Sequence, residues 1–299
     1  MFETFFFALS WRSLLGFLSV KLSVTKSLLY VWFGIFMDIL IPAESLSGEL
    51  SRVYLITREQ NGTSGKVVAS LVAHRLVGMG INVVGLLVGI FVLLLREQLG
   101  GILLSLALIL VSATTIFLIL LVLLSVRENW TLRIINFLIT CVERVSRSRW
   151  QLTKIRGEIV EAVETFHDSM QEYAHAPRTL MTSLSLSVLS WLLSLIVTHL
   201  VFLSIGKPVH WSVIVVTCSI MIAVKSIPLG VPFEAGLPEI TMSTLYIFLG
   251  VPKDVSATVT LLNRILTVWL RFFVGFMIQQ WLGLKLMIPS NVKNEESVI

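Results

Sequence analysis

The residues of this sequence with the greatest potential for chemistry are charged side chains that lie in or next to apolar stretches. They are Glu44, Glu49, Arg52, Arg75, Lys225, Glu234, Glu239, Arg264 and Arg271. An ionisable side chain at the centre of a bilayer costs roughly 2.5–3.5 kcal/mol on insertion scales. Several such groups, if unpaired, would together exceed the stability of a whole domain, which is roughly 5–15 kcal/mol. We therefore expect these side chains to face one another or a water-filled cavity.

This set of charges is suited to an anionic headgroup. Arg75 and Arg264 can each present a fork of N–H donors to phosphate oxygens, and Lys225 can add a compact positive charge. The glutamates can neutralise these cations when no ligand is bound, carry a proton, or bind an aminoacyl or sugar hydroxyl group. A purely structural role, in which Glu–Arg pairs clamp helices together, stays open as the alternative.

Two segments that carry these charges resemble each other. IPAESLSGE at 41–49 aligns with VPFEAGLPE at 231–239 at an offset of 190 (232 − 42). The coinciding residues are Pro42 with Pro232, Glu44 with Glu234, and Glu49 with Glu239. Downstream, HRL around Arg75 parallels NRI around Arg264 with one gap. This pattern predicts an internal duplication, either parallel or inverted, and interrupted helices at matching positions indicate a transporter's binding site.

Prolines and glycines mark where helices would be interrupted. The positions are Pro42, Gly48, Pro228, Gly230, Pro232 and Gly236. Proline stops the preceding helix, and glycine permits tight breaks and close helix contacts. A half-helix that begins there would direct unpaired backbone N–H groups into the cavity. Each repeat is therefore expected to contain a broken or re-entrant helix.

The elements that must position these residues are membrane helices. The chain has 299 residues, of which 56% are hydrophobic and 14% charged, whereas soluble domains carry roughly 25% charged residues. Apolar stretches at 67–95, 102–126, 179–205 and 256–287 are long enough to cross a bilayer. With shorter stretches this predicts an all-α, polytopic membrane helix bundle of six or seven spans. Residues 2–20, with Arg12 near the middle, form either a span or an interfacial helix.

We expect one transmembrane domain at 1–289, followed by a polar tail at 290–299. It divides into repeat one at about 27–126, a connection at 127–178, and repeat two at about 179–287. The connection contains eight Lys/Arg residues, which predicts a cytoplasmic position and a location in the cell membrane. Its apolar residues form helical stripes, which fit either two amphipathic helices on the membrane surface or a gate or partner site.

Other chemistry is poorly represented. The five histidines lack metal-ligand spacing, and no nucleophile–base arrangement is evident, so we expect no metal, no cofactor and no enzymatic activity. Cys141 and Cys218 are expected to be reduced thiols. No basic segment has the pattern of a nucleic-acid-binding surface. The expected partners are membrane lipids, with a homo-oligomer also possible.

The combined motifs resemble one family. PAESLSGELSR at 42–52, HRL around Arg75, PLGVPFEAGLPE at 228–239 and the run from Leu261 to Gly275 are similar to the transmembrane region of lysylphosphatidylglycerol synthases. That family is also called flippase-like or UPF0104, and the wording of the first motif resembles archaeal members. Family members often carry Glu-Arg where this chain has His74-Arg75, and Asp where it has Gly78.

The resemblance implies movement of polar lipids or lipid-linked sugars between leaflets. The leading prediction is a flippase-type transporter for an anionic or lipid-linked headgroup, either a polyprenyl-phosphate sugar or a phospholipid. Lysyl transfer is not expected, because the chain lacks the soluble aminoacyl-transfer domain. Two alternatives stay open: an intramembrane enzyme that acts on a polyprenyl-phosphate or phospholipid, and a proton-coupled small-solute transporter.

Overall fold

The computed structural model describes residues 1–41, 46–96, 100–145, 153–225 and 236–287. In these ranges all regular secondary structure is helical, which confirms the predicted all-α class. The first half contains α1 (Phe2–Phe17), α2 (Val24–Leu40), α3 (Leu46–Glu59), α4 (Ser64–Leu95) and α5 (Gly101–Val126). The connection contains α6 (Glu128–Val145) and α7 (Thr153–Ala174). The second half contains α8 (Pro177–Ser204), α9 (Trp211–Lys225), α10 (Leu237–Phe248), α11 (Lys253–Arg264), η2 (Ile265–Trp269) and α12 (Leu270–Met287).

Four of the described helices have the length and hydropathy to cross a membrane. They are α4, the Leu104–Val126 part of α5, α8, and the continuous helix Lys253–Gly283 that runs from α11 into α12. The shorter apolar helix α9 lies beside them. These four confirm the integral membrane class, whereas the sequence predicted six or seven crossings.

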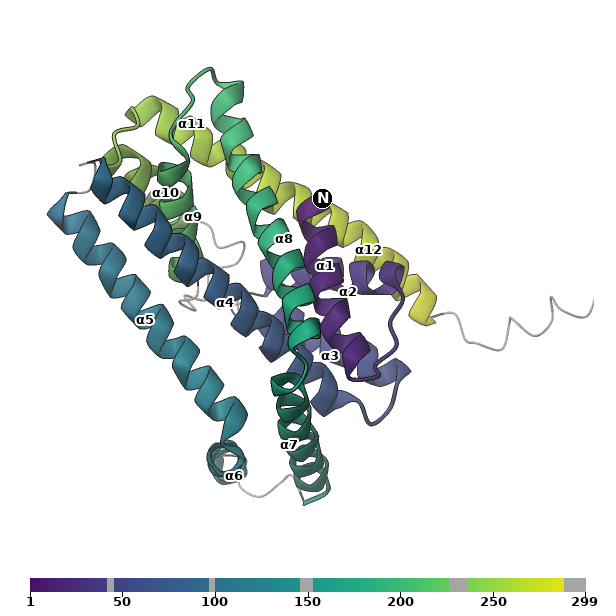
Figure 1. Ribbon diagram of the computed structural model, residues 1–299. Helices are drawn as coiled ribbons and strands as arrows, with labels where there is room; N and C mark the ends of the chain where they lie inside the picture. Colours follow the sequence, from purple (N-terminus) through teal and green to yellow (C-terminus); the bar gives the residue numbers. More distant parts are fainter. Residues whose placement is uncertain (42–45, 97–99, 146–152, 226–235, 288–299) are drawn as a thin grey trace, which may run out of the picture.

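Helix α1 lies in the interior of the bundle. Trp11, Leu14 and Leu15 are completely buried, and α1 packs along α8 (Figure 1). The Ser10 hydroxyl lies 2.8 Å from the Ser183 hydroxyl and 2.9 Å from the Ser183 carbonyl oxygen. Arg12, near the middle of the segment, donates from Nε to the Leu22 carbonyl at 2.8 Å. The first segment is thus a helix packed into the bundle.

The two halves pack against each other reciprocally. Helix α2 of the first half contacts α12 of the second, and α4 contacts α9. Both contacts depend on glycine: a Cβ at Gly275 would lie 2.6 Å from Phe36 Cβ, and one at Gly89 would lie 2.7 Å from Val216 Cγ2. In Figure 1, α1 and α8 run in opposite directions, as do α4 and the helix from α11 to α12.

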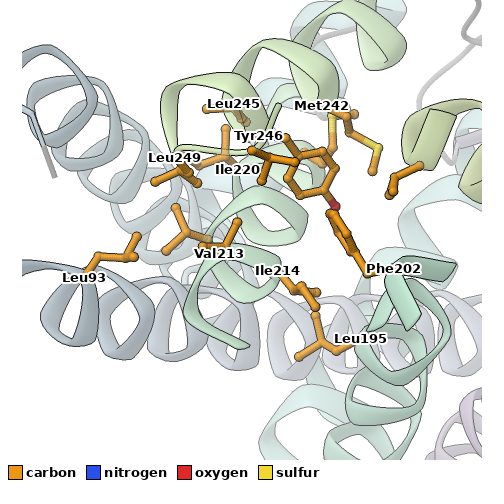
Figure 2. Packing of buried hydrophobic residues seen from close by; sticks show 14 of the residues in the cluster. Leu93, Leu195, Phe202, Val213, Ile214, Ile220, Met242, Leu245, Tyr246 and Leu249 are labelled. Carbon is orange, nitrogen blue, oxygen red and sulfur yellow. The ribbon is translucent and has the colours of Figure 1, made fainter. Parts of the chain in front are cut away.

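Each half has its own hydrophobic core. One cluster is built mainly from α1 to α4 and includes Trp11 and Leu55. The other is built mainly from α8 to α11 together with part of α4. Figure 2 shows this second cluster, in which the Phe202 ring meets the edge of the Tyr246 ring at a centroid distance of 5.1 Å. The charged residues lie on the helices that these two cores hold in place.

The connection between the halves forms two helices of different character. On α7, Val163 and Tyr173 are buried, and Phe166 and Met170 pack against the first core. The Tyr173 hydroxyl donates to the Leu14 carbonyl at 2.9 Å. The apolar stripe of α7 therefore faces the protein, whereas the described apolar side chains of α6 are more exposed.

Candidate functional site

The start of α3 is held against α2 by a carboxylate. Asp38, near the end of α2, accepts hydrogen bonds at Oδ1 from the Gly48 N–H at 2.7 Å and the Ser47 hydroxyl at 2.8 Å. N–H groups in the first turn of a helix have no preceding turn whose carbonyl oxygens could accept their hydrogen bonds. The Asp38 carboxylate accepts the bond from the Gly48 N–H instead, and also one from the Ser47 hydroxyl. A Cβ at Gly48 would collide with the Gly34 carbonyl and with Asp38. Only glycine at position 48 permits this close packing, which fixes the direction of α3.

The first charged pair joins α3 to α4. Glu49, one residue after Gly48, forms an ion pair with Arg75, with Oε1 and Nε 3.4 Å apart. The two side chains are 21% and 23% exposed, respectively. The pair is therefore partly desolvated but still accessible.

The second pair joins α10 to the end of α11. Glu239 Oε1 accepts a hydrogen bond from Arg264 Nε at 2.6 Å, and its Oε2 accepts one from the Gly236 N–H at 2.7 Å. Gly236 begins α10 with a positive φ of +97°, a conformation that favours glycine. Arg264 is only 8% exposed, whereas Glu239 is 28% exposed. The carboxylate thus bridges the start of one helix and a buried guanidinium.

The two pairs occupy matching positions in the two halves. In both, a glutamate in the first turn of a short helix contacts an arginine on the following long helix. The order of buried, half-buried and exposed positions is identical for 48–58 and 238–248. The residues aligned in the sequence are therefore aligned in their environment as well.

One local difference separates the long helices. Directly after Arg264, residues Ile265–Trp269 form a π-helical turn, whereas the described α4 is regular through Arg75. Such a turn places one extra residue in the helix and is frequent at functional sites. The Arg264–Glu239 pair therefore sits at an interruption of the helix on which Arg264 lies.

The remaining predicted site residues fall into three groups. Arg271 forms its own pair with Glu3 of α1, with Nη2 and Oε2 2.5 Å apart. Arg52 is buried, lies over the Trp11 ring, and is discussed below. Outside the described residues lie Glu44, Glu234, Pro42, Pro228, Gly230 and Pro232, together with the side chain of Lys225.

Three participants were not included in the predicted site. Asp38 positions α3, Glu3 pairs with Arg271, and Trp11 contacts Arg52. Glu3 and Trp11 come from α1, whose sequence gave no sign that it lies in the interior. A signal was available for Asp38, because it is an acid in an apolar stretch shortly before a glycine.

Comparison with known proteins gives a consistent result. A family model described as lysylphosphatidylglycerol synthase TM region matches residues 1–275. A UPF0104 membrane protein of Pyrococcus horikoshii is 24% identical over 276 residues, covering 90% of this chain and 80% of the relative. One from Methanothermobacter thermautotrophicus is 23% identical, covering 90% and 79%. One from Methanocaldococcus jannaschii is 24% identical, covering 89% and 77%. No solved structure matches the chain significantly.

Proposed function

This chain belongs to the family of lysylphosphatidylglycerol synthase TM regions, and on that premise we propose that it is a lipid flippase. Its cargo is a lipid with an anionic or lipid-linked headgroup, which it moves between the two leaflets. The observation that carries this proposal is the pair of matching, partly buried Glu–Arg contacts, Glu49–Arg75 and Glu239–Arg264.

The chemistry of these pairs suits a reversible site. Charges taken out of water are stable only while they are paired. A headgroup phosphate can replace the glutamate on an arginine, because a guanidinium binds carboxylate and phosphate with the same fork of donors. The released glutamate can then accept a proton or bind a hydroxyl or amino group of the cargo. The pairs therefore close the site when it is empty and can open for the ligand.

We infer that the two halves are an inverted duplication. The identical burial order at 48–58 and 238–248, the reciprocal packing of α2 on α12 and α4 on α9, and the opposite directions in Figure 1 support it. Helices α3 and α10 have 14 and 12 residues, or roughly 21 and 18 Å. Both fall short of a bilayer's hydrocarbon core, about 30 Å thick. We assign them as the second limbs of broken helices, an arrangement that in transporters gives access from either side.

The orientation follows from charge. We place the connection between α5 and α8, with its eight Lys/Arg residues at 127–178, on the cytoplasmic side of the cell membrane. Under this assignment α7 packs beneath the first half of the bundle at the cytoplasmic surface. Proteolysis of the connection in sealed vesicles of defined orientation tests it.

The experiment that tests the function is leaflet exchange in reconstituted vesicles. A fluorescent phospholipid is quenched from outside, and the protected fraction is followed with time. We expect wild-type protein to accelerate exchange and E239Q and R264Q each to reduce it at least tenfold, because each breaks the Glu239–Arg264 ion pair. R58Q, which removes an exposed arginine of α3, is the matched control. Normal exchange in both site variants would contradict the proposal.

A further inference from the structure

Arg52 is a buried cation that forms no ion pair with any carboxylate in the part of the chain that the structure describes. Its residue exposure is 6%, and no described residue forms a hydrogen bond with its Nη1. The guanidinium lies over the Trp11 ring, with Cζ 5.1 Å from the ring centroid. Its Nε makes one long hydrogen bond, 3.3 Å, to the Gly48 carbonyl of its own helix. A buried donor left unpaired is destabilising, and more so when it is charged.

The nearby carboxylates already have other contacts. Asp38 accepts the Gly48 N–H and the Ser47 hydroxyl, and Glu49 is paired with Arg75. Both acids are close enough to influence Arg52 electrostatically, yet no carboxylate described in the structure forms an ion pair with it. Glu49 and Arg52 are three residues apart on α3, so their side chains are neighbours on the helix surface. Arg52 therefore lies beside the partly exposed Glu49–Arg75 pair.

The matching position of the second half carries no charge. At the offset of 190 that aligns Glu49 with Glu239, Arg52 aligns with Met242. Met242 is 4% exposed and packs in the second core, near Tyr246 (Figure 2). The fold thus accepts a plain apolar side chain at this position. An arginine there in one half is not required for packing.

We propose that Arg52 binds a phosphate oxygen of the cargo, so that the first half has one more phosphate-binding group than the second. This inference rests on the proposed function for the identity of the ligand as a lipid. Nη1 supplies a charge-assisted hydrogen bond, and Trp11 holds the guanidinium in position through its ring face. Arg75, released from Glu49, supplies a second cation to the same phosphate. The Glu239–Arg264 pair has Met242 beside it and therefore lacks an equivalent of Arg52.

The test measures lipid binding by the full chain in detergent. The probes are phosphatidylglycerol and a diacylglycerol with the same acyl chains, which differ by the phosphate-bearing headgroup. We expect wild-type protein to bind phosphatidylglycerol at least tenfold more tightly than diacylglycerol. R52M should lower the affinity for phosphatidylglycerol at least tenfold and leave the affinity for diacylglycerol unchanged. R58M on the same helix is the control, because Arg58 is exposed.

R52M reproduces the residue of the matching position, so we expect it to fold and to melt at or above the wild-type temperature without lipid. R52K is a second variant, which keeps the positive charge but loses the paired N–H donors of the guanidinium. It should bind phosphatidylglycerol with an affinity between those of wild type and R52M. Phosphatidylglycerol affinity in R52M within twofold of wild type would overturn the proposal. Wild-type protein that binds both lipids equally would overturn it as well.

Two further probes identify the source of the phosphate. A polyprenyl monophosphate that binds more tightly than phosphatidylglycerol, with the same loss in R52M, supports the site and assigns it to a lipid-linked carrier. If inorganic phosphate competes with phosphatidylglycerol at equal concentration, this supports the site and assigns it to a free anion. Leaflet exchange is scored separately. Exchange that persists while R52M binds normally removes only the Arg52 assignment, and Arg52-dependent binding without exchange removes only the transport function.

Discussion

At the scale of residues, the site consists of charges that are each held by a specific neighbour. Glu239 accepts hydrogen bonds from the Gly236 N–H and from Arg264. Asp38 accepts hydrogen bonds from the Ser47 hydroxyl and the Gly48 N–H at the start of α3. Such charge-assisted bonds contribute roughly 1.5–3 kcal/mol each. The glutamates face cargo in our proposal, whereas Asp38 holds the helix that carries one of them.

Replacement of Asp38 by asparagine should therefore affect stability as well as activity. D38N keeps the size of the side chain but weakens the bonds from the Gly48 N–H and the Ser47 hydroxyl. We expect a loss of about 1–3 kcal/mol in the free energy of unfolding, measured by denaturant titration in detergent. D168N, which changes an exposed acid on α7, should lie within about 0.5 kcal/mol of wild type. A D38N protein as stable as this control would contradict the role of Asp38.

At the scale of elements, glycines set how closely helices approach. A Cβ at Gly275 would meet the Phe36 side chain, whereas nothing lies within 4 Å of a Cβ at Gly80 of α4. G275A should therefore destabilise the protein by about 1–3 kcal/mol. G80A should stabilise it by up to about 1 kcal/mol, because alanine favours the helix. Thermal melts of the two variants in parallel check this, and equal shifts would contradict the assigned contact of α2 with α12.

The π-helical turn after Arg264 gives a second prediction at this scale. Deletion of Leu266 removes the extra residue and should convert Ile265–Trp269 into regular α-helix while α12 keeps its packing. We expect a folded protein with leaflet exchange reduced at least tenfold, because the Arg264 side chain loses its local geometry. Deletion of an exposed residue of α6, such as Phe137, serves as the control. Unchanged exchange would show that the turn has no part in function.

The sequence predicted that these charged side chains would face one another, but not which ones would pair. Glu49 and Glu239 were identified because their two segments align in the sequence, and the contacts with Arg75 and Arg264 come from the structure. The motif resemblance to the family is confirmed by the match over 1–275. Glu3 was missed, because its contact with Arg271 joins residues 268 positions apart and no local pattern records it. The orientation of α7 was also left open by the sequence, because an apolar stripe can face either lipid or protein.

At the scale of the whole molecule, α1 and α8 form the seam between the halves. Ser10 contacts both Ser183 and Ser187 across it, with hydroxyl oxygens 2.8 and 2.7 Å apart. With Cys141 and Cys218 replaced by alanine, the double variant S10C/S183C should form a disulfide rapidly on oxidation. S13C/S183C should not, because Ser13 bonds to its own helix. Gel mobility after oxidation measures this, and equal cross-linking of both pairs would contradict the seam.

The interior position of α1 has a consequence for biosynthesis. Helix α1 leaves the ribosome before α8, and Ser10 of α1 finds its hydroxyl partner on α8, 173 residues later in the chain. Until α8 is translated, the completely buried Ser10 lacks the partners, Ser183 and Ser187, that its hydroxyl has in the folded protein. The nascent chain must therefore shelter α1 at the translocon or among lipids while α2 to α7 are made. The packing of α1 can then be completed only after α8 has been made. Truncated chains that end before α8 should therefore be degraded by membrane proteases.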